Sequence, residues 1–255
     1  MIEVKNLHKG FGDVKVLKGI NATFHPGKTN LIIGQSGAGK TVFLKSLIGL
    51  HAPEEGTISF DGRINTKFTI EEKRQWRQEI GMVFQGSALF DSQTVEENVM
   101  FPLKMFTKKS QAEMLERVNF VLDRVNLENS NTKLPAELSG GMQKRVAIAR
   151  AIVMNPKYLF CDEPNSGLDP QTATVIDNLI QEITDEYQIT TVINTHDMNS
   201  VMEIGEKILF LKDGKKEWEG SSEDMLKTDN KIVVDFVYSS NLFKKVREAY
   251  LNETK

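Results

Sequence analysis

The residues best suited to chemistry are the eight from Gly34 to Thr41, which read GQSGAGKT and match the spacing G-x-x-x-x-G-K-[ST]. An apolar run precedes them and a helical pattern follows, which is the strand, loop and helix order that this motif requires. Its glycines let backbone N–H groups converge on phosphate oxygens at the start of a helix. We therefore predict a phosphate-binding loop made of Gly34, Gln35, Ser36, Gly37, Ala38, Gly39, Lys40 and Thr41.

The last two residues of this loop, Lys40 and Thr41, indicate what it binds. A lysine at this position neutralises the β and γ phosphates of a nucleotide. The threonine offers a hydroxyl oxygen to Mg²⁺, a cation that prefers hard oxygen ligands and bridges the β and γ phosphate oxygens. The loop thus predicts a nucleoside triphosphate and Mg²⁺ as cofactors.

Two carboxylates and a histidine follow other apolar runs. KYLFCDEP ends in Asp162 and Glu163, and INTHD carries His196. We expect Asp162 to hold the Mg²⁺ shell, and Glu163, which strand alternation would point the other way, to orient and deprotonate water. His196 is expected at the γ phosphate, because parallel sheets gather ligand sites at their carboxyl edge. The alternative is that all three are structural residues at strand ends.

These residues need a scaffold of strands and helices. Short apolar runs, NLII, IGMVF, KYLFC and TTVIN, are separated by helical patterns and are typical of buried parallel strands. Alternating patterns over residues 14–24 and near residue 60 predict antiparallel strands with one wet face. The predicted fold class is α/β: a P-loop NTPase with a RecA-like parallel sheet, an N-terminal antiparallel β layer and an inserted helical subdomain.

The helical period sets the expected domain organisation. It dominates residues 108–154, where Val118 and Leu122 share a face, so we predict a helical subdomain at about 86–155 within an ATP-binding domain of residues 1–230. Residues 231–255 form a predicted helical tail. A capping-box pattern at Ser221 predicts a short helix before it, and Lys244, Lys245 and Arg247 are expected to be exposed in the tail.

Composition excludes several classes of function. Lys and Arg total 32 against 35 Asp and Glu, a net charge of -3, which argues against a nucleic-acid partner. No apolar window approaches the ~18 residues of a membrane span, and no secretory signal is evident, so cytosolic residence is expected. The single cysteine, Cys161, is predicted to be a buried thiol, and His8, His25 and His51 are predicted to be surface residues.

A second serine and glycine motif identifies a family. LSGGM, residues 138–142, opens a predicted helix with groups suited to anions, and SGLDP follows at residues 166–170. With these motifs the chain resembles the ATP-binding subunit of an ABC transporter along essentially its full length. The resemblance implies ATP as the nucleotide and a head-to-tail dimer with a second copy of the chain. In that dimer Ser139, Gly140 and Gly141 cover the partner's γ phosphate, and Asp169 contacts the partner.

The same resemblance assigns further residues by position. It implies that Phe11 stacks on adenine and that Gln85 senses Mg²⁺ and water, so that the implied metal residues are Thr41, Gln85 and Asp162, the last through water. Four positions depart from the commonest pattern: Phe11 for tyrosine, Met142 for glutamine, Asn165 for threonine and Gly167 for alanine. None removes a phosphate or metal ligand, and Glu163 and His196 are present, which favours an active ATPase.

The stretch FQGSALFDSQTVEENVMF, residues 84–101, narrows the family. It closely resembles the corresponding stretch in the ATPases of Mla or mammalian-cell-entry (MCE) phospholipid transport systems. The basic pair that follows LSGGM also fits that group. The resemblance implies an integral membrane permease and an MCE-domain lipid-binding protein as partners, with the chain peripheral on the cytoplasmic side of the inner or plasma membrane. It places Gly86 to Asp91 in a groove that receives a short permease helix.

Two alternative functions stay open. One is the ATPase of another ABC importer or of a lipoprotein-release system, and the other is a non-transport ATPase of iron-sulfur assembly. Both use the same nucleotide motifs. The stretch at residues 84–101, the basic pair after LSGGM and the identity of the partner proteins separate these alternatives from lipid transport.

Overall fold

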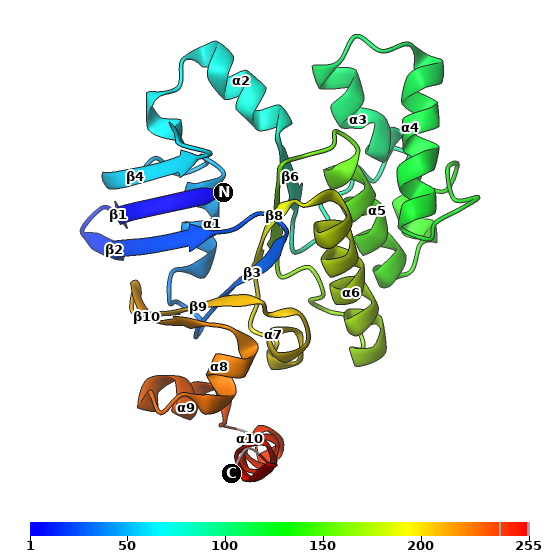
Figure 1. Ribbon diagram of the computed structural model, residues 1–255. Helices are drawn as coiled ribbons and strands as arrows, with labels where there is room; N and C mark the ends of the chain where they lie inside the picture. The colour runs from blue at the N-terminus through cyan, green and yellow to red at the C-terminus, as the bar shows by residue number, and fades with distance from the viewer. Residues whose placement is uncertain (240, 254–255) are drawn as a thin grey trace. The chain divides into compact units, whose positions relative to one another are not determined.

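The computed structural model describes residues 1–239 and 241–253, which form two compact units (Figure 1). The first unit contains residues 1–67 and the chain from Asn194 onward, and the second contains residues 68–193. Each is described by itself below. The predicted division between residues 1–230 and 231–255, and the helical subdomain at about 86–155, stay predictions.

An antiparallel β layer opens the first unit. Strand β1 (Ile2–Phe11) pairs antiparallel with β2 (Val14–Phe24) on one side and with β4 (Glu55–Phe60) on the other, and β5 (Arg63–Ile64) pairs with β4. Alternate side chains of these strands are buried, as a sheet with one wet face requires. The predicted antiparallel strands are confirmed.

A second group of strands in this unit leads into the phosphate loop. Strand β3 (Lys28–Ile33) pairs parallel with β9 (Lys207–Lys212), and β10 (Lys215–Gly220) pairs antiparallel with β9. All of β3 after Lys28 is buried, as its apolar run predicts. Helix α1 (Lys40–Leu47) follows the loop and ends three residues short of the predicted helical pattern, before Gly49 at φ 74°.

Four short helices complete the first unit: α7 (Met198–Ile204), α8 (Ser222–Lys227), α9 (Lys231–Val237) and α10 (Asn241–Glu253). Ser221 and Asp224 form the predicted capping box of α8. Lys244 and Lys245 are exposed as expected. The prediction for Arg247 was wrong, because its guanidinium donates hydrogen bonds to the Leu226 and Thr228 carbonyls at the end of α8.

The second unit contains three strands in the order β8-β7-β6. They are β6 (Ile80–Val83), β7 (Tyr158–Asp162) and β8 (Thr190–Asn194). Strand β6 runs parallel to β7, and every residue of β7 and β8 is buried. Near-continuous apolar runs therefore do mark parallel strands covered on both faces.

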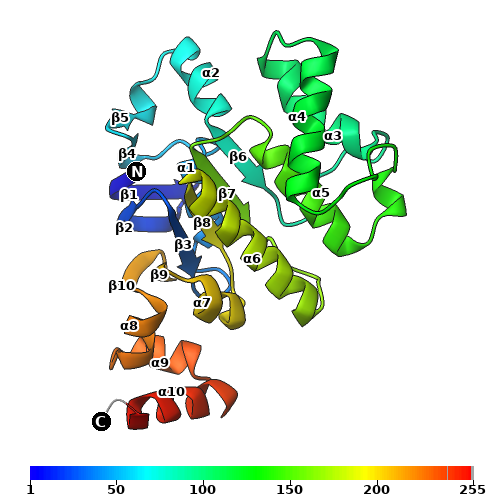
Figure 2. The same cartoon turned by 45° about the vertical axis from the view of Figure 1, so that its right-hand side comes forward.

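Helices surround these strands. They are α2 (Ile70–Gln78), α3 (Val95–Phe106), α4 (Gln111–Arg124), α5 (Gly140–Ile152) and α6 (Pro170–Tyr187). Short 3-10 turns η1 (Asn65–Lys67), in the first unit, and η2 (Pro135–Glu137) join longer elements. Helix α5 is central, since it packs against α3, α4, α6 and β6, and Figure 2 shows α4 and α3 close beside it.

Helix length and hydropathy bear on membrane insertion. Within residues 1–239 and 241–253, no helix is both long and apolar enough to cross a bilayer.

Candidate active site

The phosphate loop takes a shape that glycine alone permits at two positions. Gly34 has φ 149°, and a Cβ there would lie 2.2 Å from the Leu211 carbonyl oxygen. Gly39 has φ 99°, and its Cβ would lie 3.0 Å from a Leu17 methyl carbon. Both residues have a positive φ, which residues with a Cβ rarely adopt. The motif's two glycines are thus fixed by the fold, immediately before α1 begins at Lys40.

Backbone hydrogen bonds hold the rest of this loop. The Ala38 amide donates to the Gln35 carbonyl over 3.1 Å, and the Gly214 amide donates to the Ala38 carbonyl over 3.2 Å. The Lys40 ammonium lies 2.8 Å from the Gly34 carbonyl oxygen, so it sits over the loop it belongs to. The loop residues Gln35, Ser36, Gly37 and Thr41 are exposed and available to a ligand.

Asn194 and Thr195 belong to the first unit and contact the residues around the phosphate loop. The Asn194 side-chain amide lies within hydrogen-bonding distance of the Thr41 hydroxyl, and the Thr195 amide donates to the Ile32 carbonyl at the end of β3. His196 follows and is exposed, just before Asp197 caps α7. Asn194 is not among the predicted site residues, although it is a polar residue that ends the apolar run TTVIN, and such a position is a signal of function.

Phe11 ends β1 with a half-exposed ring, as an aromatic surface for a base requires. The His51 ring meets it edge-on, with ring centroids 5.1 Å apart, and the Lys9 ammonium lies 5.0 Å from its centroid. His51 is partly exposed, and its ring contact with Phe11 adds a role that the sequence did not indicate. A residue 40 positions away along the chain gives no local pattern of such a contact.

In the second unit, Asp162 and Glu163 lie at the end of β7, and each is only 9% exposed. Glu163 has φ 50°, so it lies beyond the strand in a left-handed turn. The expectation that strand alternation directs this side chain was therefore wrong: the turn directs it. A non-glycine residue in this region is uncommon and is found most often at functional sites.

Buried polar groups support this turn. The Asn165 amide donates to the Asp177 carboxylate over 3.1 Å, and both side chains are buried. This hydrogen bond gives a physical role to Asn165, where the family pattern has threonine. Cys161 is buried as predicted, and burial raises the pKa of its thiol far above the usual range.

Gln85 follows β6 with an exposed side chain, and its backbone is held from α5. The Lys144 ammonium donates a hydrogen bond to the Gln85 carbonyl oxygen. Burial lowers the pKa of Lys144, while the nearby Glu163 carboxylate acts in the opposite direction. The sequence shows the basic pair after LSGGM but gives no sign of this contact.

Ser139 of the LSGGM motif and Asp169 of the SGLDP motif each cap the start of a helix. Ser139 is the N-cap of α5 and accepts a hydrogen bond from the Met142 amide over 3.3 Å, which leaves its O–H free to donate. Asp169 is the N-cap of α6 and accepts from the Thr172 amide and hydroxyl over 3.0 and 2.6 Å. These bonds lower the pKa of Asp169. A Cβ at Gly141 would lie 2.6 Å from a Thr172 methyl.

The predicted site residues fall into two sets. The first unit holds Phe11, residues 34–41 and His196, and the second holds Gln85, Ser139, Gly140, Gly141, Asp162, Glu163 and Asp169. Across the described part of the chain, no three His, Cys, Asp or Glu side chains cluster closely enough to hold a metal. The roles assigned to these residues stay predictions.

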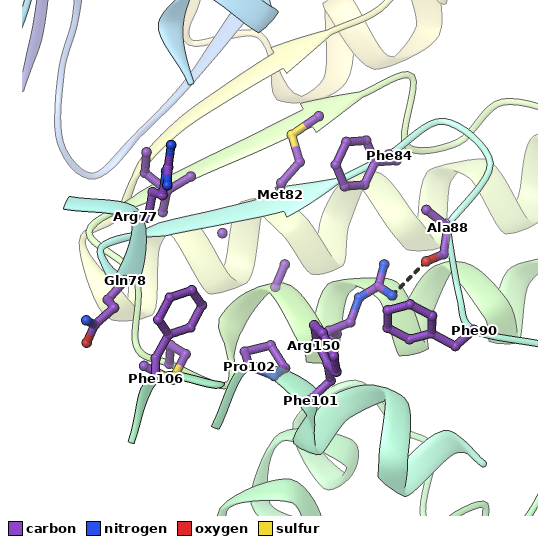
Figure 3. Close-up of a pocket in the computed structure, with 14 residues that line it drawn as sticks. Arg77, Gln78, Met82, Phe84, Ala88, Phe90, Phe101, Pro102, Phe106 and Arg150 are labelled. Carbon is purple, nitrogen blue, oxygen red and sulfur yellow. Dashed lines mark hydrogen bonds between the residues drawn. The ribbon is translucent and has the colours of Figure 1, made fainter. Parts of the chain in front are cut away.

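An apolar groove of about 290 Å³ lies in the second unit, at the end of β6 (Figure 3). Figure 3 shows Phe84, Phe90, Phe101, Pro102 and Phe106 around it, with Arg150 reaching the Ala88 carbonyl. Phe84 and Phe90 are each about two-fifths exposed (39% and 40%), and they lie together in the same apolar groove, which makes the exposure informative. The stretch that the sequence placed in a partner groove thus contributes Ala88 and Phe90 to its lining.

Asn98 fixes this stretch onto α3. Its carbonyl oxygen accepts from the Phe90 amide over 2.8 Å, and its amide group lies within 3.2 Å of the carbonyls of Phe90, Gln93 and Thr94. Asn98 is fully buried, and Thr94 and Glu97 form a capping box at the start of α3. The ALFDS and ENV parts of the motif are therefore bonded to each other.

Comparison with known proteins gives a family match. A family model described as "ABC transporter" matches residues 17–166. Its span includes the phosphate loop, the LSGGM motif and the carboxylates after β7.

Three relatives of this chain have names that point to different transport functions. The methionine import ATP-binding protein MetN of Clostridium tetani is 43% identical over 85% of this chain and 67% of its own length. The probable ribonucleotide transport ATP-binding protein mkl of Mycobacterium leprae is 37% identical over 92% of this chain and 68% of its own. Protein TRIGALACTOSYLDIACYLGLYCEROL 3 of Arabidopsis thaliana is 36% identical over 94% of this chain and 74% of its own.

Solved structures match the fold. The dimeric structure of MJ0796, a bacterial ABC transporter cassette, has a TM-score of 0.79 and 35% identity, covering 87% of this chain and 99% of that chain. A dimeric post-hydrolysis state of the same cassette, bound to ADP and Pi, has a TM-score of 0.79 and 34% identity over the same shares. The predicted α/β fold of the P-loop NTPase class is confirmed.

Proposed function

The chain belongs to the ABC transporter family, and on that premise we propose that it is the ATP-hydrolysing subunit of a system that moves phospholipids between membranes. ATP binding and hydrolysis come with the family, and a related cassette has been solved with the hydrolysis products. The cargo, the partners and the individual site residues are the proposal.

We assign nucleotide binding to the phosphate loop and the residues around it. The amides of residues 34–41 and the Lys40 ammonium bind the phosphates, and Phe11 stacks on adenine. The Thr41 hydroxyl, the Gln85 side-chain oxygen and Asp162, through water, are hard oxygen donors that suit Mg²⁺. When bound, Mg²⁺ neutralises charge on the β and γ phosphates.

We assign hydrolysis to Glu163 and His196. Glu163 orients the attacking water and accepts its proton, and its near-complete burial at a left-handed turn supports a precise placement of that carboxylate. His196 is exposed directly after β8 and contacts the γ phosphate. In a head-to-tail dimer of two copies, Ser139, Gly140 and Gly141 cover the partner's γ phosphate and Asp169 contacts the partner.

The observation that carries the partner proposal is the apolar groove formed by the stretch at residues 84–101. A separate membrane permease inserts a short helix there, because half-exposed phenylalanines gain about 25 cal/mol for each Å² they bury. The chain then sits on the cytoplasmic side of the inner or plasma membrane, held by the permease.

The lipid cargo and an MCE-domain partner rest on the ALFDS and ENV pattern, whose two halves are joined by Asn98. They are supported by the plant relative, whose name is that of a galactolipid. A second candidate, amino-acid import, is favoured by the 43% identity with MetN.

Affinity purification of the chain from membranes tests these proposals. Recovery of a multi-span permease, an MCE-domain protein and bound phospholipid supports lipid transport. An amino-acid permease without lipid supports the second candidate instead. Scaffold proteins of iron-sulfur assembly, with no permease, would overturn both.

A further inference from the structure

Two cationic side chains of α5 hold the loop that follows β6. Lys144 donates to the Gln85 carbonyl, and Arg150 donates to the Ser87 and Ala88 carbonyls over 2.7 Å each. Lys144 is 5% exposed, so its ammonium is largely withdrawn from water and depends on such acceptors. Charge-assisted hydrogen bonds of this kind are among the stronger ones in proteins.

The loop held in this way is in an unfavourable conformation. Ser87 and Ala88 have φ 61° and 49°, two successive residues in the left-handed region. Side chains with a Cβ resist this region, and such strain persists only where surrounding structure fixes it. The fork of the Arg150 guanidinium fixes it by bonding both carbonyls at once.

The loop and the start of helix α5 have different proposed functions. Ala88 and Arg150 line the apolar groove, as Figure 3 shows. Helix α5, which carries both cations, begins at its N-cap Ser139. One rigid helix thus connects the groove with the serine that we assign to the partner's ATP.

We propose that Lys144 and Arg150 together act as a carbonyl clamp. The clamp ties the loop Gln85–Ala88 to α5, so that a permease helix bound in the groove repositions Ser139 for hydrolysis. The inference rests on the proposed function of the groove as a permease site. Both are positioning residues, because they act through the loop and the helix and touch no reacting atom.

Arg145 provides a matched control on the same helix. Its guanidinium also donates to backbone carbonyls, those of Val125 and Asn126 at 3.4 and 3.3 Å, but these lie at the end of α4 and not in the loop. Loss of Arg145 therefore removes a comparable cation and comparable bonds without touching the clamp.

The test measures ATP hydrolysis by the complex of the chain with its permease. Arg150→Lys keeps the positive charge, but its ammonium lacks the planar fork that bonds two carbonyls at once. Lys144→Met keeps an unbranched side chain of similar length but has no N–H donor. We expect each to lower kcat, measured per assembled complex with the permease, by about 2-fold to 30-fold, with KM for ATP unchanged. Lys144→Arg is expected to restore turnover, and Arg145→Met to retain it.

Several results would overturn the clamp. These are wild-type kcat in Arg150→Lys and Lys144→Met, an equal loss in Arg145→Met, or a rise in KM that accounts for the loss. If Lys144→Met does not fold, as thermal unfolding will show, Arg150→Lys and Lys144→Arg decide the question. If the wild-type chain retains no permease, the proposed function fails. Hydrogen exchange of the Ser87 and Ala88 amides in the isolated chain then tests the clamp, which predicts faster exchange in Arg150→Lys and wild-type exchange in Arg145→Met.

Discussion

The Asn194 side-chain amide donates to the Thr41 hydroxyl oxygen over 3.4 Å and so joins the end of β8 to the first turn of α1. A threonine hydroxyl has two acceptor lone pairs and one proton. The bond from Asn194 uses one lone pair and leaves the second available to a cation. Asn194 thus orients a proposed Mg²⁺ ligand without being one.

Asn194→Leu is expected to raise the Mg²⁺ concentration for half-maximal ATP hydrolysis by about 10-fold, because groups that orient a metal ligand contribute about that much affinity. Titration of Mg²⁺ at saturating ATP measures the effect. Asn199→Leu removes an exposed amide nearby and serves as the control. An unchanged Mg²⁺ requirement in Asn194→Leu would show that Thr41 needs no such support.

Glu163→Gln is expected to bind ATP normally and to hydrolyse it about 100-fold more slowly or worse, because the amide cannot accept the water's proton. Nucleotide affinity and single-turnover hydrolysis measure the two effects. Glu116→Gln, an exposed carboxylate of α4, should behave as wild type. Near-normal turnover by Glu163→Gln would remove this residue from the catalytic step.

Ser139→Arg is expected to block hydrolysis and leave ATP binding by the same subunit's phosphate loop intact, because the serine is assigned to the partner's nucleotide. The change also removes an N-cap, which costs about 1 kcal/mol. Ser110→Arg removes the matching cap of α4 and controls for that loss. Parallel losses of nucleotide affinity and turnover in Ser139→Arg would contradict the composite site.

Phe90→Asp is expected to release the permease, since it places a charge in the apolar groove, while ATP binding by the isolated chain stays normal. Copurification from membranes and a nucleotide-binding assay measure the two effects. Phe120→Asp changes another exposed phenylalanine, which lies on α4 outside the groove. Retention of the permease by Phe90→Asp would move the docking site elsewhere.

Glu206 gives a prediction on pH. Partial burial raises its pKa, but hydrogen bonds from the Lys28 ammonium at 2.6 Å and the Thr29 amide at 2.9 Å outweigh this, so the pKa lies below the ordinary value of 4.5. A lowered pKa in the folded state stabilises the protein above pH 4.5, and this contribution is lost as the pH falls through the folded value.

Glu206→Gln should therefore lower the free energy of unfolding at pH 7 by about 0.2 to 1 kcal/mol, the usual range for a largely solvated pair. The difference should vanish in acid, once the wild-type carboxylate is protonated. Denaturant unfolding at a series of pH values measures it, with the exposed Glu203→Gln as control. A difference that persists in acid would point to packing and not to charge.

Local patterns allowed much of the fold to be predicted. The glycines of the phosphate loop, the apolar strands β3, β7 and β8 and the capping boxes at Thr94 and Ser221 are encoded within a few residues, and the structure contains them. Physical rules of turns and helix starts act over this same short range.

Contacts made at long range were not predictable. Lys144 meets a carbonyl 59 residues earlier, and Arg247 meets one 21 residues earlier. A backbone carbonyl is present at every residue, so no sequence pattern marks the one that a cation will reach. The predicted direction of the Glu163 side chain was wrong for a different reason. This residue lies in a left-handed turn after the strand, where the alternation of side chains no longer applies.

The bonds between Asn98 and Phe90 have a consequence for engineering by exchange of segments between related ATPases. The partner-facing residues end near Asp91, yet their backbone is held by a buried amide eight residues beyond Phe90. A chimera that carries residues 84–91 into another cassette would receive the side chains without the group that shapes them. The smallest transferable piece runs from Phe84 to Asn98, and two cassettes sharing it share a loop geometry, whatever each one transports.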